Sequence, residues 1–323
     1  MAKKIGLVGI YFPGAYDALH ENVPEGFELV DALSPEAYGN LADCEYLISR
    51  LDIDPDIINH TPNVKFWQRW GAGFDHVDLK AWGERGIPIA TCPGVNSGIV
   101  AELAIMLMLA GYRNLLQINR QLRAGHWPRT EYFGRSFMIK GKTVGVLGLG
   151  HIGKKVAALA TAFGANVIYY DIVRQTEQEE RFGYRFVDFD TLVRESDIFT
   201  IHCPLNEETR GMIGAAQFAQ MKPTAMLINT ARGPIVNEAA LIDALTTGKI
   251  ATAGLDTYEH EPLPKDHPLL TLDNVVASAH AGGNTKDNDI NMVNYVYHNI
   301  VAFDRGEPLN TPNDIVNGAY LKK

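Results

Sequence analysis

Cysteine is scarce in this chain of 323 residues. The three cysteines, Cys44, Cys92 and Cys203, are far apart in the sequence and odd in number. This spacing excludes a disulfide framework and matches no zinc motif. We therefore expect ordinary buried thiols in a reducing compartment, and hence a cytoplasmic protein.

Long apolar runs are also missing. The most apolar stretch, residues 99–112, is too short to cross a bilayer and contains Glu102. The first apolar run, Ile5–Ile10, lacks the length of a signal-peptide core, so we expect it to be a β-strand.

Positive charge is in deficit, with 29 Lys and Arg against 38 Asp and Glu and a formal net charge of −9. Nucleic acids and anionic membranes need a basic surface, so neither is expected as a main partner. The other proportions, 46% hydrophobic and 21% charged, are those of a globular protein, and the length allows two domains. We expect the partner to be a small molecule.

What the chain does contain is one informative stretch at residues 142–171, KTVGVLGLGHIGKKVAALATAFGANVIYYD. An apolar run is followed by three glycines, a helical pattern, a second apolar run and an acid. In a dinucleotide site, Gly148 permits the turn out of the strand, Gly150 lets the backbone approach the pyrophosphate, and Gly153 lets the helix pack against the sheet. The amides of His151 and Ile152, at the start of the helix, meet the phosphates.

Asp171 ends the second apolar run, where a carboxylate can accept both ribose hydroxyls and would repel a 2′-phosphate. The cofactor predicted is therefore NAD. Arg174 lies three residues further on and could offset that repulsion, so the sequence leaves open whether NADP is also accepted.

The order of strands and helices predicts an α/β protein with two Rossmann-like parallel-sheet domains. Strands are expected at 5–10, 45–48, 64–67 and 88–90, with short helices at 55–60 and 79–84 between them. A long helical segment follows at 97–124, then strands at 143–147, 167–170, 197–201, 225–229, 251–255 and 274–277, and a helix at 286–305. We predict that a cofactor domain (101–290) is inserted into a smaller, flavodoxin-like substrate domain (1–100 and 291–323), with the tail folded back on the latter. The site is expected in a cleft between the two.

Three polar side chains each follow a predicted strand of the second half: Arg232, Glu261 and His280. This set suits reduction of a 2-keto acid. Arg232 can hold the substrate carboxylate and polarise the carbonyl, His280 can transfer the proton, and Glu261 can fix the imidazole tautomer. No metal site is expected, because prolines break the segment around the nearby histidines.

The chain resembles the D-isomer-specific 2-hydroxyacid dehydrogenases, phosphoglycerate dehydrogenase among them, over essentially its whole length. The resemblance lies in GLGHIG at 148–153, HCPLNEETRGMI at 202–213, MKPTAMLINTARGPIVNEAAL at 221–241, AGLDTYEHEP at 253–262 and SAHAGG at 278–283. WGAGFDHVD at 70–78 and PGVNSGIVAEL at 93–103 resemble the family's substrate loop and domain crossing.

This resemblance implies that Arg232, Glu261 and His280 are catalytic. It also implies further contacts: with the substrate carboxylate by the amides of Ala72 and Gly73, with the nicotinamide carboxamide by Asp256, and with the cofactor by Thr230 and Ala231. A homodimer that uses the helix beginning near Ser97 is implied as well. One departure is Asn237, where the family has an acid, and we interpret it as a helix cap.

The substrate stays open at this point. Arg50 and Arg69 match arginines near the phosphate in phosphoglycerate-type members, whereas Tyr11, Trp67 and Phe74 would suit an apolar or aromatic 2-keto acid. Branched, small and phosphorylated acids all remain candidates, and 3-phosphoglycerate dehydrogenase itself is one alternative. An alternative of another class is an NAD(H)-sensing, corepressor-like interaction protein. Formate oxidation is disfavoured because that type would have an amide in place of Glu261.

Overall fold

The computed structural model describes residues 2–51, 53–75 and 77–321, so position 76 of the predicted substrate loop lies outside the described residues. The chain divides into two compact units, Met1–Asn96 with Asn284–Lys323 and Ser97–Gly283. The predicted domain limits, 100/101 and 290/291, lie a few residues beyond these divisions.

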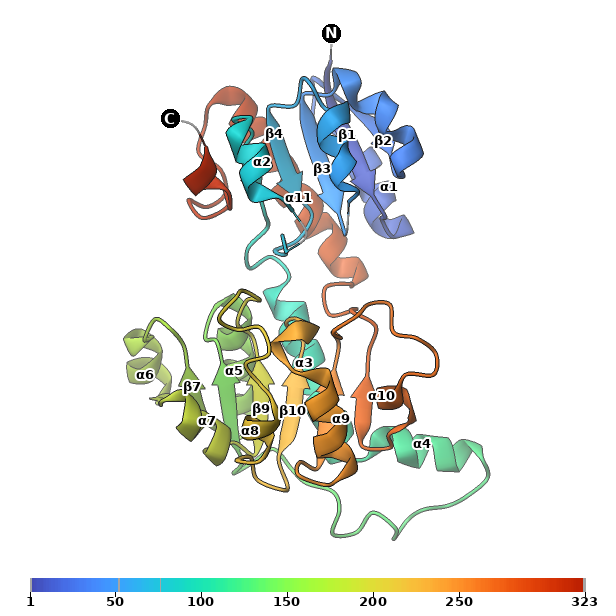
Figure 1. Cartoon of the computed structure of the whole chain (residues 1–323), viewed down its shortest axis with the longest axis vertical. Helices are drawn as coiled ribbons and strands as arrows, with labels where there is room; N and C mark the ends of the chain where they lie inside the picture. Colours follow the sequence, from blue (N-terminus) through green and yellow to red (C-terminus); the bar gives the residue numbers. More distant parts are fainter. Residues whose placement is uncertain (1, 52, 76, 322–323) are drawn as a thin grey trace. The chain divides into compact units, whose positions relative to one another are not determined.

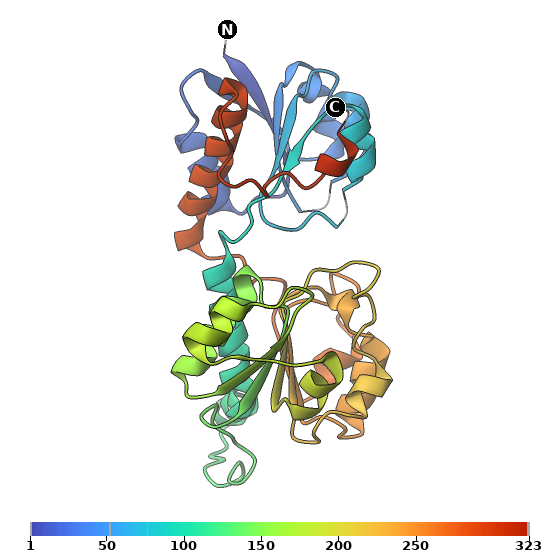
Figure 2. The ribbon, with the colours of Figure 1, turned by 90° about the vertical axis from the view of Figure 1, so that its left-hand side faces the viewer.

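The first unit is a five-stranded, all-parallel sheet with the order β2-β1-β3-β4-β5. This order is that of flavodoxin-like folds, as predicted. Two apolar clusters fill the two faces of the sheet, one beneath α1 and α11, the other beneath the helices of the opposite face (Figure 2). Its elements are β1 (Lys3–Gly9), α1 (Pro13–Glu21), β2 (Phe27–Ala32), η1 (Pro35–Asp43), β3 (Tyr46–Arg50), η2 (Pro55–His60), β4 (Phe66–Arg69), α2 (Leu79–Glu84), β5 (Ile89–Ala90), α11 (Lys286–Arg305) and η4 (Gly318–Tyr320).

The second unit is a seven-stranded parallel sheet with the order β12-β11-β10-β9-β6-β7-β8 (Figure 1). The order reverses between β6 and β9, which in open α/β sheets marks the ligand crevice at the carboxyl ends of the strands. Its elements are α3 (Ser97–Tyr112), α4 (Leu115–Arg123), β6 (Thr143–Leu147), α5 (His151–Ala162), β7 (Asn166–Tyr170), α6 (Thr176–Phe182), β8 (Arg185–Phe186), α7 (Phe189–Glu195), β9 (Ile198–Ile201), α8 (Ala215–Phe218), β10 (Met226–Asn229), η3 (Gly233–Ile235), α9 (Glu238–Thr246), β11 (Thr252–Leu255), α10 (Pro268–Thr271) and β12 (Val275–Ala277).

Apolar side chains cover both faces of this second sheet, with α3 and α5 on one face and α9 on the other (Figure 2). Strands buried on both faces read as continuous apolar runs, which is why the sequence located most of them. The short edge strand β8 and, in the first unit, β2 and α1 were missed because their apolar runs are short or mixed.

Two predicted segments differ from the structure. The helix expected over 97–124 is two helices bent by 63°, because Asn114 adopts a left-handed backbone, φ 53°, between them. The predicted helix at 55–60 is a 3₁₀ helix. Lys286–Arg305 is helical as predicted, and the tail returns to the first unit, where the Val316 amide donates to the Ile89 carbonyl.

No single described helix is long and apolar enough to cross a membrane. The bent pair α3 and α4 passes that test only when both helices are counted together.

Candidate active site

The three predicted catalytic residues lie on loops that leave neighbouring strands at one level. β10, β11 and β12 pair in parallel register, with Asn229 opposite Leu255 and Leu255 opposite Ala277. The three strands therefore end together, and their loops rise from the same edge of the sheet. This register brings Arg232, Glu261 and His280 to the same edge of the sheet, although they are about 20 to 50 positions apart in the sequence.

His280 and Glu261 form a hydrogen-bonded pair, with His280 Nδ1 2.7 Å from Glu261 Oε2. Burial alone would raise the pKa of Glu261, but the hydrogen bonds from His280 and the Tyr258 amide, with the charges of His280 and Arg232, lower that pKa below its usual value. Glu261 is therefore ionised and accepts the Nδ1 proton. This assigns the neutral ring to the tautomer that leaves Nε2 unprotonated.

A left-handed backbone places His280 in this pair. Its φ is 50°, a backbone conformation that residues other than glycine rarely adopt. Asp256 holds the turn: its carbonyl accepts from the His280 amide at 2.8 Å, and its two carboxylate oxygens accept from the amides of Ala281 and Gly282, both at 2.9 Å. Asp256 is only 2% exposed. The structure thus gives Asp256 a positioning role for His280, which the sequence did not indicate.

The turn that carries Arg232 is shaped by Asn229, which is 1% exposed at the end of β10. The Asn229 side chain donates to the Arg232 carbonyl and accepts from the Ala231 amide. Gly233 then lies against the backbone of the next loop: a Cβ at this position would be 1.9 Å from the Tyr258 carbonyl carbon. The Arg232 and Glu261 loops are therefore packed backbone to backbone.

The glycine loop after β6 has the geometry predicted for a dinucleotide. Gly148 has φ 91°, and a Cβ there would meet the Cys203 amide nitrogen at 2.7 Å. A Cβ on Gly150 would meet nothing within 4 Å, so the backbone is open to a ligand at this point. No side chain caps the start of α5, which leaves the amides of His151 and Ile152 available for phosphate oxygens.

Asp171 directly follows β7, and its two oxygens accept from the amides of Leu149 and Val173 at 2.6 and 3.1 Å. These contacts fix the carboxylate beside the glycine loop while leaving lone pairs for ribose hydroxyls. At the carboxyl ends of β9, β10 and β11, His202 Nδ1, Thr230 Oγ1 and Thr257 Oγ1 are buried with no hydrogen-bond partner among the described residues. The polar groups present fit a dinucleotide.

Ala72 and Gly73, the predicted carboxylate contacts, lie on the loop after β4 in the first unit. Neither backbone amide donates a hydrogen bond within the described part of the chain, so both remain available for an anion. Gly71 precedes them with φ 118°, which turns the chain out of the strand.

Arg50 and Arg69 are each 7% exposed at the carboxyl ends of β3 and β4. Arg50 donates to the Ile10 carbonyl at 3.3 Å and to Asn284 Oδ1 at 2.8 Å, and its guanidinium lies 4.1 Å from the centroid of the Phe12 ring. Arg69 donates to the Leu51 carbonyl at 3.0 Å. Both guanidinium groups already have partners within the first unit.

Trp67 does not line a substrate pocket, which corrects its interpretation as a specificity residue. It is 2% exposed in the core of the first unit, where it packs against Trp82 and donates to Ser49 Oγ. In a strand as short as β4, the alternation of apolar and polar residues does not show which side chains face the core and which face a ligand site. Phe74, by contrast, is 38% exposed on the predicted substrate loop.

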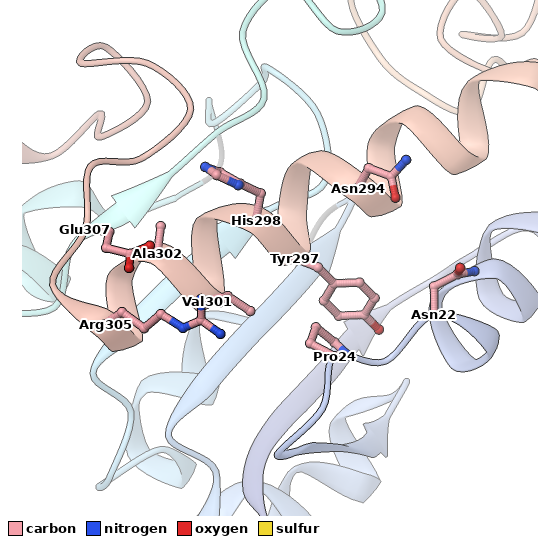
Figure 3. Close-up of a pocket in the computed structure, with 9 residues that line it drawn as sticks. All are labelled: Asn22, Pro24, Asn294, Tyr297, His298, Val301, Ala302, Arg305 and Glu307. Atoms are coloured by element: carbon pink, nitrogen blue, oxygen red, sulfur yellow. The ribbon is translucent and has the colours of Figure 1, made fainter.

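A surface pocket of about 430 Å³ lies on the α1 and α11 side of the first unit (Figure 3). It contains none of the predicted site residues. Its lining residues are Asn22, Pro24, Asn294, Tyr297, His298, Val301, Ala302, Arg305 and Glu307.

Asn229 and Tyr258 are the site residues that sequence reasoning missed. Tyr258 donates through its hydroxyl to the Ser278 carbonyl at 2.7 Å and through its amide to Glu261, so it ties the β11 loop to the β12 loop. An Asn at the end of a strand is a recognised turn signal and could have been found. Asn237 is a helix cap, as predicted: its side chain accepts from the Ala240 amide.

The sequence model of the NAD-binding domain of D-isomer specific 2-hydroxyacid dehydrogenases matches residues 105–282, more than half of the chain. The chain belongs to this family. It is 38% identical over 284 residues to the glyoxylate reductase of Korarchaeum cryptofilum, covering 87% of this chain and 85% of the relative. With D-3-phosphoglycerate dehydrogenase of Archaeoglobus fulgidus it shares 41% identity over 81% of this chain, but it spans about half (49%) of that longer relative.

Among solved structures, the dehydrogenase is similar to the NAD-dependent formate dehydrogenase of Staphylococcus aureus in complex with NAD. The TM-score is 0.84 at 29% identity, over 97% of this chain and 98% of the other. The family and the fitting glycine loop identify the dehydrogenase as NAD-dependent. Its described residues hold no cluster of three or more His, Cys, Asp or Glu able to bind a metal ion.

The contacts of Asp256 predict the effect of Asp256→Asn. An amide nitrogen would replace one carboxylate oxygen, so either the Ala281 or the Gly282 amide would lose its acceptor at a cost of about 1–3 kcal/mol in the free energy of unfolding. Because the same turn sets His280, kcat should fall about tenfold or more. Asp266→Asn, in an exposed loop, is the matched control. An unchanged kcat would remove Asp256 from the positioning of His280.

The burial of the His202 ring leads us to predict that the stability of the fold depends on pH. Burial lowers the pKa of this ring from 6.5 to about 3. Below pH 6.5 the unfolded chain takes up a proton on this ring while the folded chain does not, so the folded state loses stability as the pH falls towards 3. At pH 5 this loss is about 2 kcal/mol. Chemical unfolding of His202→Gln should therefore show a smaller loss between pH 7 and pH 5 than the unchanged protein. His126→Gln, at an exposed position, should behave like the unchanged protein, and an identical loss in His202→Gln would contradict the assignment.

Proposed function

We propose that the protein reduces a small 2-keto acid to the corresponding D-2-hydroxy acid. The observation that carries this proposal is the hydrogen bond between His280 Nδ1 and Glu261 Oε2 at 2.7 Å, on the sheet edge that also carries the Arg232 turn. A cation, an ionised carboxylate and an imidazole of fixed tautomer are the groups that carbonyl reduction requires.

NADH, when held by the glycine loop and Asp171, would supply the hydride to the carbonyl carbon. The protonated His280 donates the Nε2 proton to the carbonyl oxygen, and Glu261 stabilises the imidazolium before the transfer. Arg232 is a planar donor that binds the carboxylate and polarises the carbonyl. In the oxidative direction, neutral His280 accepts the hydroxyl proton at Nε2.

A small, unphosphorylated substrate is supported by two observations. Both guanidinium groups proposed for a phosphate are engaged within the first unit, and the large Trp67 ring belongs to the core. Several relatives that cover most of this chain are named glyoxylate reductase or glyoxylate/hydroxypyruvate reductase. Glyoxylate and hydroxypyruvate are therefore the substrates we expect to be preferred.

The test follows NADH absorbance with glyoxylate, hydroxypyruvate, pyruvate, 2-ketoisocaproate, phenylpyruvate and 3-phosphohydroxypyruvate. We expect the highest kcat/KM with glyoxylate or hydroxypyruvate. A preference for the phosphorylated acid would instead make the chain a 3-phosphoglycerate dehydrogenase that uses Arg50 and Arg69. NADH binding without turnover of any acid would support an NAD(H)-sensing interaction protein.

Replacing His280 tests the chemical step. His280→Ala should lower kcat by about a hundredfold or more, because general acid catalysis is lost, and leave the Kd for NADH within about twofold. His260→Ala, at an exposed position of a neighbouring loop, is the control. Normal turnover by His280→Ala would make the acid–base assignment wrong.

We propose further that the protein is a homodimer in the cytoplasm. The three cysteines are free thiols, which suits a reducing compartment. α4 has no buried residue, and the segment after it exposes Trp127, Phe133 and Met138 by 79%, 74% and 66%. Large apolar side chains exposed to this extent favour contact with a second copy of the chain.

Light scattering after size exclusion tests the dimer. We expect twice the mass of the chain, and we expect the double variant Trp127→Ser/Phe133→Ser to shift towards the monomer because its apolar contact area is reduced. Phe163→Ser, which removes a half-exposed aromatic after α5, should remain dimeric. A monomer at micromolar concentration of the unchanged protein would contradict this assembly.

A further inference from the structure

Arg174 is the cation nearest in sequence to Asp171, and it follows the position where the adenosine ribose of a dinucleotide binds. An arginine in this loop is the usual means of accepting a 2′-phosphate, so its state bears on the choice between NAD and NADP. Ile172 and Val173, between the two residues, are 88% and 60% exposed. The loop is therefore open to a ligand, and packing of the loop does not block Arg174.

Glu179 on α6 engages the Arg174 side chain through both carboxylate oxygens. Arg174 Nε lies 2.9 Å from Glu179 Oε1, and Nη2 lies 2.7 Å from Oε2. The guanidinium also lies 5.5 Å from the centroid of the Phe186 ring. A bidentate, charge-assisted pair of this kind fixes the plane and direction of the guanidinium.

The carboxylate is itself held by a buried tyrosine. Tyr169 is fully buried in β7, and its hydroxyl donates to Glu179 Oε1 at 2.7 Å while accepting from the Gln175 amide at 2.8 Å. The Glu179 side chain is 18% exposed, against 59% for Arg174. The hydrogen bonds from Arg174 and Tyr169 lower the pKa of Glu179 to about 2, so the pair is charged at any working pH. Glu179 is thus a fixed anchor, and Arg174 is the part that could move.

We propose that Glu179 is a cofactor-specificity residue: it binds Arg174 and thereby withholds a cation, the nearest to Asp171 in sequence, that could neutralise a 2′-phosphate there. Two features then disfavour NADPH, the repulsion by Asp171 and the engagement of Arg174. Glu179 acts through Arg174, so it is a positioning residue. This inference rests on the NAD-linked function proposed above and deepens it.

The test measures the Kd of NADH and of NADPH by quenching of intrinsic fluorescence, at low ionic strength. Glu179→Gln keeps an acceptor for Tyr169 but removes the charge that holds Arg174. We expect the Kd of NADPH to fall about fivefold to tenfold, because Arg174 can then pair with the phosphate, and the Kd of NADH to stay within about twofold.

Two variants separate this effect from a general loss of negative charge. Glu180→Gln makes the same charge change one residue further along α6, at an exposed position with no ion pair among the described residues, and should change the Kd of NADPH by less than about twofold. Glu179→Gln/Arg174→Ala should lose the gain. Thermal unfolding of each variant shows that it is folded.

The outcomes are distinct. An unchanged Kd of NADPH in folded Glu179→Gln, a gain that persists in the double variant, or an equal gain in Glu180→Gln would each overturn the proposal. A protein that binds neither NADH nor NADPH in any form would instead overturn the dehydrogenase function on which the proposal rests.

Discussion

The parallel register of β10, β11 and β12 is the constraint on which the candidate site depends. Leu255 pairs with Asn229 on one side and with Ala277 on the other, so the three following loops begin at one level. Each loop then contributes one polar group: Arg232, Glu261 or His280. A slip of one residue in any pair would turn every side chain of that strand to the opposite face, and the apolar contacts on both faces oppose such a slip.

A second layer of contacts turns this common level into a defined geometry. Backbone groups provide most of it: the Tyr258 amide that donates to Glu261, the Ser278 carbonyl that accepts from the Tyr258 hydroxyl, the closely packed Gly233, and the Gly282 amide that donates to Asp256. His280 has a left-handed backbone, which costs about 1–2 kcal/mol and persists because the surrounding hydrogen bonds determine it. The imidazole is thereby held in place before any substrate binds, which would reduce reorganisation during the proton transfer that we propose for His280.

Much of the fold and of the candidate site was predictable from the sequence, for physical reasons that differ between residues. The glycine loop and Asp171 form one local unit, and Arg232, Glu261 and His280 each follow a buried apolar run, so their common edge follows from parallel pairing. The positioning role of Asp256 was not predictable, because the amides that donate to its carboxylate lie 25 and 26 residues away and the left-handed turn leaves no mark in an Ala-His-Ala sequence. The ion pair of Arg174 was not predictable, because its partner Glu179 lies one helical turn into α6. The burial of Trp67 was not predictable either, because it depends on which face of β4 meets the core.

The central claim is that Glu261 fixes the tautomer of His280 so that Nε2 carries out the proton transfer. Nitrogen NMR of protein labelled in histidine, with the His280 signal assigned by its loss in a His280→Ala sample, reports which ring nitrogen bears the proton. The account predicts that the neutral ring has its proton on Nδ1, and that this proton is shifted downfield by the hydrogen bond to Glu261. A neutral His280 with its proton on Nε2 would contradict the account, since Nδ1 would then need a donor that the Glu261 carboxylate does not have.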